Sequence, residues 1–202
     1  MSARPKLVVG LGNPGKEYEG TRHNIGFAAL DRLAEKFDCS FRSKWRFSAK
    51  IAEAVAGDAG KVVLAKPQTY MNLSGTSVAP LMAKHEIETD RLIVVHDELD
   101  LNWTAVRIKP KGSAAGHNGM KSLIASLRTD EFTRVRLGIH PDHPVSDGAE
   151  FVLSPFRRAQ MEELDELTSY AADAVCSIIA EGVEKAMARF NRRVPGLITE
   201  EE

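Results

Sequence analysis

Short apolar segments alternate along this chain with segments of helical period, and this alternation constrains the fold more than any other feature. The strand-like segments are 6–10, 47–56, 61–66, 91–96, 106–109 and 134–140. The helix-like segments are 24–37, 78–85, 118–127, 156–168 and 170–190. Strands that alternate with helices predict an α/β fold with a central mixed, twisted sheet flanked by helices. We expect one domain over 1–202, with the C-terminal helices over or beside a cleft and a frayed tail at 195–202.

The apolar runs are too short to cross a bilayer, and the first strand-like segment follows Met1–Lys6 without an apolar signal region. The two cysteines, Cys39 and Cys176, lie far apart in unlike contexts, so we expect no disulfide. These features predict a cytoplasmic protein with no membrane partner.

The charge balance is close to neutral, with 27 basic and 28 acidic residues, and it argues at first against a nucleic-acid partner. Basic residues nevertheless alternate along two segments, at Arg107, Lys109 and Lys111 and again at Arg134 and Arg136. A local basic face can hold phosphates on a neutral protein. The alternative for each cluster is an ordinary solvated surface.

Gly10–Gly15 matches the G-x-G-x-x-G fingerprint of dinucleotide-binding proteins and follows a predicted strand. The residues after Gly15 do not begin a helix, since Gly20 interrupts them, and Asp31 lies inside a helical segment instead of at the end of a second strand. We therefore expect no nucleotide cofactor. The glycines are expected to turn the backbone so that Asn13 is presented at a strand end.

Polar side chains follow several of the predicted strands, where open α/β sheets place their sites. They are Asn13 after the first strand, Asn72 after 61–66 and Asp97 after 91–96. His23 precedes the first helix, and His117 and Asn118 stand at the entry to another. Taken singly, each has an ordinary explanation such as a helix cap or a turn. Together they predict one polar site.

A histidine, a carboxylate and several carboxamides can hydrolyse an activated carbonyl compound. A neutral histidine takes a proton from water, and a carboxylate on its other nitrogen fixes the tautomer. Asparagine N–H groups stabilise the oxyanion. No serine or cysteine nucleophile is evident, so water attack on an ester is the chemistry that we expect. A metal site at His140–His143 or at His96 and Asp97 is the enzymatic alternative. We do not favour it, because the first lies in a loop rich in proline and aspartate that is typical of exposed surface, and because His96 and Asp97, as adjacent strand residues, point to opposite faces.

Five segments resemble, in order and spacing, the motifs of bacterial peptidyl-tRNA hydrolases. They are Gly10–Tyr18, Thr21–Phe27, Lys66–Gly75, His96–Asp100 and Gly116–Gly119. The resemblance implies a monomeric α/β enzyme that hydrolyses the ester between a peptide and the 3′-terminal ribose of tRNA, without metal or cofactor. Its partners would be the 3′ CCA end, the acceptor-stem phosphates and the nascent peptide of peptidyl-tRNA.

The resemblance also implies roles for individual residues. The catalytic residues it implies are His23, Asp97 and Asn13, with Asn13, Asn72 and Asn118 binding substrate and stabilising the reacting carbonyl. Those implied for the cleft are Tyr18, Met71 and His117. Those implied for a clamp on the tRNA phosphate are Arg107, Lys109 and Arg136, a small local clamp that needs no basic protein overall.

Two departures from the family pattern lie near the cleft. Leu101–Thr104 replaces a turn rich in proline and glycine, which leaves the direction of the Arg107 strand open. Ala114 and Ala115 replace glycines and could stiffen the loop before His117. Two alternatives remain at this point: an RNA-processing factor of the same fold without hydrolase activity, and an esterase for small substrates, which would leave the basic residues unexplained.

Overall fold

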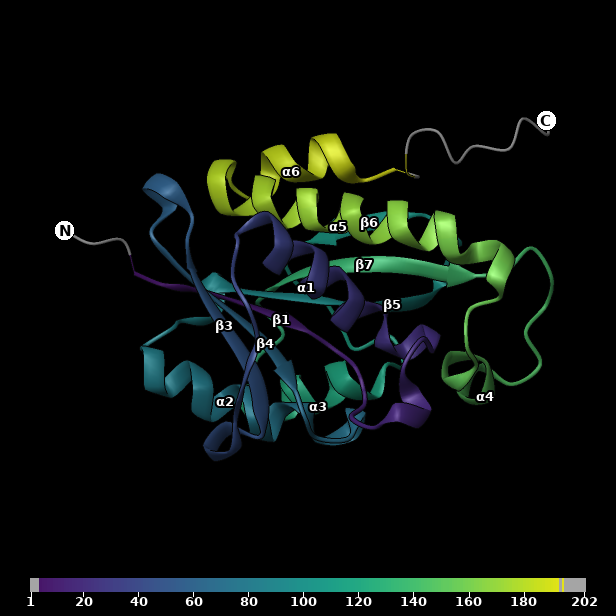
Figure 1. Cartoon of the computed structure of the whole chain (residues 1–202), viewed down its shortest axis with the longest axis horizontal. Coiled ribbons are helices and arrows are strands. Elements are labelled where there is room, and N and C mark those ends of the chain that lie inside the picture. Colours follow the sequence, from purple (N-terminus) through teal and green to yellow (C-terminus); the bar gives the residue numbers. More distant parts are fainter. Residues whose placement is uncertain (1–3, 193, 195–202) are drawn as a thin grey trace.

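Seven strands in the described part of the chain form one mixed sheet, with helices on both of its faces (Figure 1). The computed structural model describes residues 4–192 and 194. The strands are β1 (Lys6–Gly10), β2 (Arg42–Lys44), β3 (Ala49–Val55), β4 (Lys61–Pro67), β5 (Leu92–Asn102), β6 (Val106–Lys109) and β7 (Thr133–His140). The helices are α1 (Ile25–Lys36), α2 (Ser74–His85), α3 (Asn118–Leu127), α4 (Gly148–Leu153), α5 (Met161–Glu181) and α6 (Val183–Phe190).

The strand order is β2-β3-β4-β1-β5-β7-β6, with a parallel centre formed by β4, β1, β5 and β7. The outer pairs β2–β3, β3–β4 and β6–β7 are antiparallel. Gly10, the last residue of β1, is in register with Val95 of β5. Asp97 therefore lies just beyond the end of β1, at the edge of the sheet where the central strands end.

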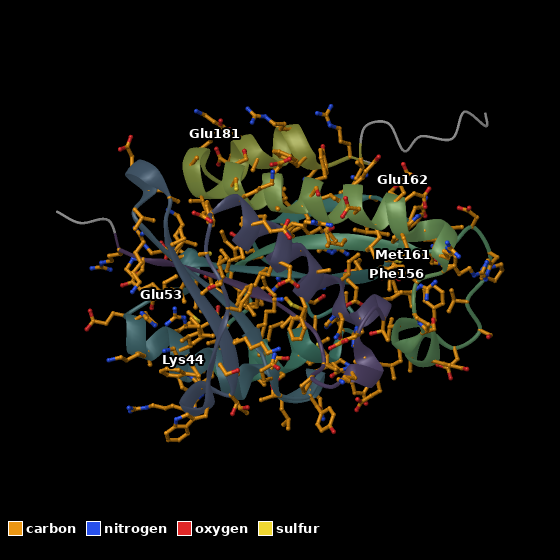
Figure 2. The ribbon with its side chains drawn as sticks, in the orientation of Figure 1. Lys44, Glu53, Phe156, Met161, Glu162 and Glu181 are labelled. Carbon is orange, nitrogen blue, oxygen red and sulfur yellow. The ribbon has the colours of Figure 1, made fainter. Side chains whose placement is uncertain are left out.

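The molecule has three layers, with the sheet between two groups of helices and a hydrophobic cluster on each face of the sheet. One cluster lies between the sheet and α1, α5 and α6, and the other lies between the sheet and α2 and α3. Figure 1 shows these two groups of helices on opposite sides of the strands. The long α5 runs from Met161 to Glu181 along its face of the sheet (Figure 2). The central strands are buried on both sides, as their apolar sequence predicts.

Gly10 and Gly26 allow α1 to begin directly against the end of β1 and against Val95 within β5. A Cβ atom at Gly10 would lie 2.3 Å from the carbonyl oxygen of Gly26, and one at Gly26 would lie 2.5 Å from that of Val95. Gly10 and Gly12 are not among the glycines with positive φ, whereas Gly15 has a φ of 112°. The expectation that these glycines serve mainly to turn the chain is thus wrong for the first two, which serve close packing.

The fold class predicted from the sequence is confirmed: a single α/β domain with a mixed sheet flanked by helices. A 3₁₀-helix, Lys16–Tyr18, follows Gly15 where a dinucleotide-binding protein would have an α-helix, and Asp31 lies within α1 as expected. Two boundaries differ clearly from the prediction, and one strand was not predicted. Strand β5 continues from the predicted end at His96 to Asn102, helix α2 begins at Ser74 instead of Val78, and the short edge strand β2 was not predicted.

The C-terminal helices differ most from the prediction. The predicted break near residue 169 lies inside α5, and the chain breaks instead at Gly182, whose φ of 94° ends α5. The loop expected over 141–148 leads into a helix that was not predicted, α4, which Asp147 caps by accepting hydrogen bonds from the amides of Ala149 and Glu150. The predicted tail at 195–202 lies outside the described residues.

The two departures from the family pattern have local consequences. Thr104 takes a left-handed φ of 65° in the turn before β6. The preceding Trp103 donates a hydrogen bond from its indole to Glu163 at 2.6 Å and packs on Phe156 with ring centroids 5.3 Å apart. Ala115 takes a φ of 44°, a conformation that glycine favours.

Among the residues that the structure describes, no helix is long and apolar enough to cross a membrane.

Candidate active site

The structure places His23 and Asp97 in direct contact, although they are 74 positions apart. Asp97 lies on β5 and is only 2% exposed. His23 lies on the 3₁₀-helix Arg22–Asn24, directly before α1. Its Nδ1 atom is 2.9 Å from one carboxylate oxygen of Asp97 and 3.0 Å from the other. The close start of α1 against β5 brings the two side chains together.

A second imidazole contacts the same carboxylate. His117 Nε2 is 2.9 Å from Asp97 Oδ1, and its ring lies 4.8 Å from the His23 ring. Burial alone would raise the pKa of the Asp97 carboxyl, but the facing imidazoles of His117 and His23 hold it well below its ordinary value. Asp97 is therefore an ionised hydrogen-bond acceptor for both rings.

The residue that precedes Asp97, His96, is buried and stays neutral. Its Nδ1 atom is 2.7 Å from the carbonyl oxygen of Asp97, and its Nε2 atom has no hydrogen-bond partner among the described residues. Burial, reinforced by the nearby His117, lowers the pKa of His96 from 6.5 to about 3. Because an ionised imidazole would be desolvated here, the ring adds no charge to the site at neutral pH.

This burial makes stability depend on pH. Between pH 6.5 and 3 the unfolded chain protonates His96 and the folded chain does not, so folding stability falls as the pH falls. We expect a loss of about 2 kcal/mol from this residue between pH 7 and 5. Urea unfolding at the two pH values should show that loss in the wild type and not in His96→Asn. Equal losses in both proteins would contradict a buried neutral ring.

Asn13 is held at the end of β1 by hydrogen bonds to Asn24 and Met71. Its backbone N–H donates to Asn24 Oδ1 at 2.8 Å, and Asn24 Nδ2 donates back to its carbonyl oxygen at 2.9 Å. Its side-chain Oδ1 accepts from the backbone N–H of Met71 at 2.7 Å. The amide orientation is thereby fixed, and the Nδ2 donors have no partner among the described residues. Asn24, whose position next to His23 was the available signal, was not predicted.

His23, Asp97, His117 and Asn118 line one pocket of about 260 Å³. Its other walls come from the end of β5, from the loop before α3 and from Gly148, Ala149 and Val152 of α4. Helix α4 is anchored beside His23 because Arg22 donates to Ser154 Oγ at 2.7 Å and to the Pro155 carbonyl at 2.8 Å. Neither α4 nor Arg22 was predicted as part of the site. The sequence signal for α4 is its N-cap residue, Asp147.

The other residues predicted for the cleft, Tyr18, Met71 and Asn72, do not line this pocket. Tyr18 contacts the exposed Tyr70 edge to face, with ring centroids 6.5 Å apart, and Tyr70 precedes the 3₁₀-helix Met71–Leu73. Met71 is buried, whereas Asn72 is exposed. Met71 also approaches the start of α3, because a Cβ at Gly119 would lie 2.5 Å from its sulfur. The Asn72 and Asn118 side chains have no hydrogen-bond partner among the described residues.

The basic residues lie on the β6–β7 edge. Arg107 is in register with Arg136, and Lys109 with Arg134, so the four share one face of the sheet. Arg136 is paired with the buried Glu98, at 2.7 Å and 2.8 Å, and Arg134 holds the carbonyl oxygen of Ser113 at 2.9 Å. Lys109 is exposed and Arg107 half-exposed. Neither has an acidic partner in the described part of the chain.

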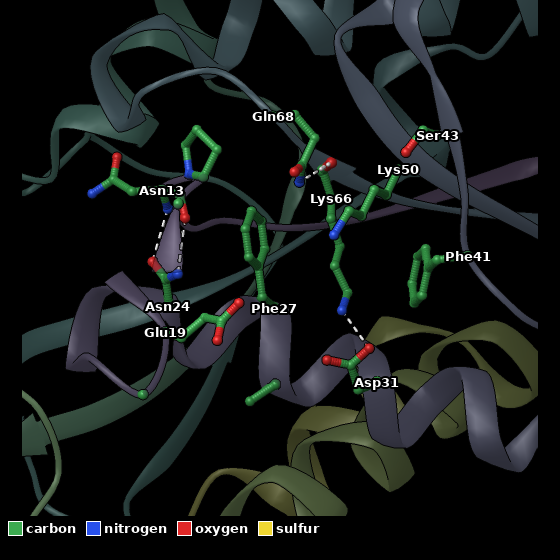
Figure 3. A pocket seen from close by; sticks show the side chains of 14 residues that line it. Asn13, Glu19, Asn24, Phe27, Asp31, Phe41, Ser43, Lys50, Lys66 and Gln68 are labelled. Atoms are coloured by element: carbon green, nitrogen blue, oxygen red, sulfur yellow. Dashed lines mark hydrogen bonds and ion pairs between the residues drawn. The ribbon is translucent and has the colours of Figure 1, made fainter. Parts of the chain in front are cut away.

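A second hollow, of about 510 Å³, lies beside α1 and is lined by Asn13 and Asn24, which do not line the first pocket (Figure 3). Its most buried cation, Lys66, bonds to Asp31 and lies 4.4 Å from the ring centroid of Phe41. Burial lowers the pKa of Lys66. This hollow contains neither a histidine nor a carboxylate–imidazole pair, so it does not offer the chemistry of the first pocket.

The described residues contain one group that could hold a metal ion, His23, Asp97 and His117, whose ligand atoms lie within 4.8 Å of one another. The alternative metal site considered at His140–His143 does not belong to this group. An ionised Asp97 requires a proton on each contacting ring nitrogen, and a metal would have to displace both. The site as built is a hydrogen-bonded carboxylate between two imidazoles.

Comparison with known proteins gives a consistent result. A family model described as peptidyl-tRNA hydrolase matches residues 7–196. The peptidyl-tRNA hydrolase of Solibacter usitatus is 59% identical over 199 residues, covering 96% of this chain and 98% of the relative. That of Koribacter versatilis is 47% identical, covering 93% of each chain. The crystal structure of peptidyl-tRNA hydrolase from Acinetobacter baumannii has a TM-score of 0.86 at 32% identity, covering 96% of this chain and 98% of that one.

Proposed function

The chain belongs to the peptidyl-tRNA hydrolase family and hydrolyses the ester between peptide and tRNA, and we propose that His23 and Asp97 activate the attacking water. The observation that carries this proposal is the 2.9 Å contact between His23 Nδ1 and the buried Asp97 carboxylate. Since an ionised carboxylate only accepts, Nδ1 carries the proton and Nε2 keeps its lone pair. His23 lines the pocket and is therefore placed to take a proton from water there.

The proposed reaction uses His23 in this pocket and Asn13 at the end of β1. His23 Nε2 removes a proton from water as the water oxygen attacks the ester carbonyl. Asn13 stabilises the oxyanion through its Nδ2 donors, which the Met71 bond to Oδ1 leaves available. As the intermediate collapses, the 3′-oxygen of the ribose leaves and takes the proton from His23. The products are free tRNA and a peptide carboxylic acid, which releases its proton to the solvent, and Asp97 stabilises the imidazolium in between.

In this proposal Asn118, which lines the pocket, and Asn72, Tyr18 and Met71 outside it bind the substrate. Asn118 and Asn72, whose amides are exposed, contact the ester and the 3′ end from two sides. Tyr18 and Met71 line the path of the peptide and the 3′ end. The RNA-processing factor without activity is not favoured, because the family match extends over nearly the whole chain and both members of the dyad are present.

Release of tRNA from N-acetyl-aminoacyl-tRNA and from the unblocked aminoacyl-tRNA tests the activity. We expect release only from the blocked substrate, at a rate that a chelator of divalent ions does not change. Absence of release from both substrates would reject the function, and loss of activity with the chelator would reject a mechanism that depends on the side chains alone.

We propose that Lys109 and Arg107 hold an acceptor-stem phosphate, with the charge of Arg136 largely offset by Glu98. Arg107 is in register with Arg136, and Arg136 is in register with His96, the residue before Asp97, so this basic edge is connected through β7 to the strand that carries the dyad. Lys109→Ala should weaken tRNA binding and reduce the salt dependence of log Kd by about 1. A minimal nucleotide ester should be hydrolysed almost as before. An unchanged salt slope would exclude Lys109 from the clamp.

We further propose that the enzyme acts as a monomer in the cytoplasm, where its tRNA substrate is found. The locally basic edge and the family match support an encounter with tRNA. Light scattering of the purified chain should give a mass near 22.2 kDa. A mass twice as large would contradict the monomer.

A further inference from the structure

Both ring nitrogens of His117 are engaged within the protein. His117 is the N-cap residue of α3: its Nδ1 atom accepts from the backbone N–H groups of Gly119 at 3.1 Å and Met120 at 3.3 Å. Its Nε2 atom is 2.9 Å from the Asp97 carboxylate. We propose that His117 is a positioning residue, which fixes the Asp97 carboxylate against the first turn of α3 and cannot itself act as the base. This inference rests on the proposed role of His23 and Asp97.

The hydrogen bonds determine the tautomer of His117. A backbone N–H can only donate, so Nδ1 must carry a lone pair, and the proton of a neutral ring must then be on Nε2. That proton points at an ionised carboxylate. To accept a proton in catalysis, His117 would have to give up both capping bonds at the positive end of a helix dipole, where a further positive charge is unfavourable.

His23 is arranged in the opposite way. Its proton is on the nitrogen that faces Asp97, and its other nitrogen has no partner among the described residues. Asp97 thus lies between two imidazoles that both donate to it, and only one of them retains an available lone pair. The helix cap assigns the role of base to His23.

The surroundings of His117 restrict its ring. The preceding residues Ala115 and Gly116 both have positive φ, at 44° and 83°, and bring the chain back to the start of α3. Arg134 fixes the same loop through the carbonyl of Ser113. On one side the ring lies edge-on to His96, with centroids 4.8 Å apart. A Cβ at Gly119 would lie 3.1 Å from its Cε1 atom. The ring is therefore a rigid link between α3 and Asp97.

The other ionisable groups facing this cluster are few. His96 is neutral, because its burial lowers its pKa to about 3. Glu98 on β5 is neutralised by Arg136 on β7, and Asp100 stands at the outer wall of the pocket. Arg22, next to His23, is turned towards Ser154 and Gln160. From α4, the pocket is lined only by Gly148, Ala149 and Val152.

Two substitutions separate the two bonds of His117. An asparagine amide ends about where Nδ1 lies, so His117→Asn keeps the helix cap and does not reach Asp97. A glutamine amide extends one carbon further, so His117→Gln keeps a donor to Asp97 and loses the cap. The capping loss should lower the melting temperature of His117→Gln only, by a few degrees.

For His117→Asn we expect kcat to fall by about 10- to 100-fold, because the carboxylate is free to rotate, with KM changed less than about twofold. Asp97 also loses a donor and attracts the proton of His23 more strongly. The acid limb of the pH–rate profile should therefore move to higher pH, by about 0.5–1 unit. In His117→Gln the limb should stay in place.

Wild type and His23→Ala measured in parallel distinguish failure of the inference from failure of the proposed function. If His117→Asn and His117→Gln both raise KM and leave kcat and the acid limb of the pH–rate profile unchanged, His117 is a substrate contact and the inference is overturned. Long-range ¹H–¹⁵N NMR of the whole protein adds a readout independent of activity. We expect the Nε2–H tautomer for His117 and the Nδ1–H tautomer for His23 at neutral pH, and an Nδ1–H tautomer of His117 would overturn the inference.

Discussion

His23→Ala should lower kcat/KM for peptidyl-tRNA by about 10²- to 10⁴-fold, the usual contribution of a general base. The loss has a direct structural reason, since His23 is the one imidazole on Asp97 with an available nitrogen. Binding of tRNA to the variant should remain close to that of the wild type, because the β6–β7 edge is unaltered. Single-turnover release of tRNA and filter binding at fixed salt would measure the two quantities separately.

His85→Ala is a suitable control for this substitution. His85 is the last residue of α2, at the end of the helix remote from Ser74 and the sheet edge that carries the site. Its removal should leave the rate within about twofold of the wild type. A His23→Ala enzyme that keeps more than a tenth of the wild-type rate would exclude His23 as the base.

Asp97→Asn should have an effect at least as large, on the order of 10⁴-fold in kcat. The asparagine offers one acceptor oxygen and one donor group in place of two oxygens. Since the cap of α3 holds the His117 proton on Nε2, the new oxygen must face His117. The new amide N–H₂ then faces His23 Nδ1 and forces the proton of that ring onto Nε2, where it can no longer accept one from water.

The same argument predicts how the effect of Asp97→Asn can be relieved. In a His117→Asn background the amide can turn, so its oxygen can face His23 and restore the active tautomer. The double variant should then lose less activity than the product of the single losses, a non-additivity that a kinetic double-mutant cycle measures. Asp90→Asn, in the exposed turn before β5, is the matched control and should retain full activity. Fully additive losses would show that tautomer selection is not the cause.

The local parts of this architecture could be predicted from the sequence. Apolar periodicity located β1, β4, β7 and α1 to within one residue, the start of β5 but not its end, and helix α3 at its observed bounds. It failed at α4 and at the break between α5 and α6. A helix of six residues that rests on Arg22 has too few periodic positions to be recognised, and the uninterrupted apolar face of α5 hides where the helix ends.

The candidate residues were recognisable for the same reason, since each follows a strand or begins a helix. Their motifs also identified the family. Their contacts were not recognisable. Arg107, Lys109 and Arg136 look equivalent in the sequence, but the structure pairs Arg136 with Glu98 and leaves the other two without an acidic partner among the described residues. Pairing of charges depends on strand register, which alternation within one strand does not specify.

The sequence by itself thus determined the fold class, the family and the residue types of the site, because these depend on local periodicity and on motifs. Only the tertiary structure decided that one carboxylate lies between two imidazoles, and which of the two keeps a nitrogen available for water. The reason is physical. Asp97 meets His23 through the close approach of α1 to β5 at Gly26, and it meets His117 through the loop that Arg134 fixes. Both contacts join segments whose relative position is set by packing across the sheet.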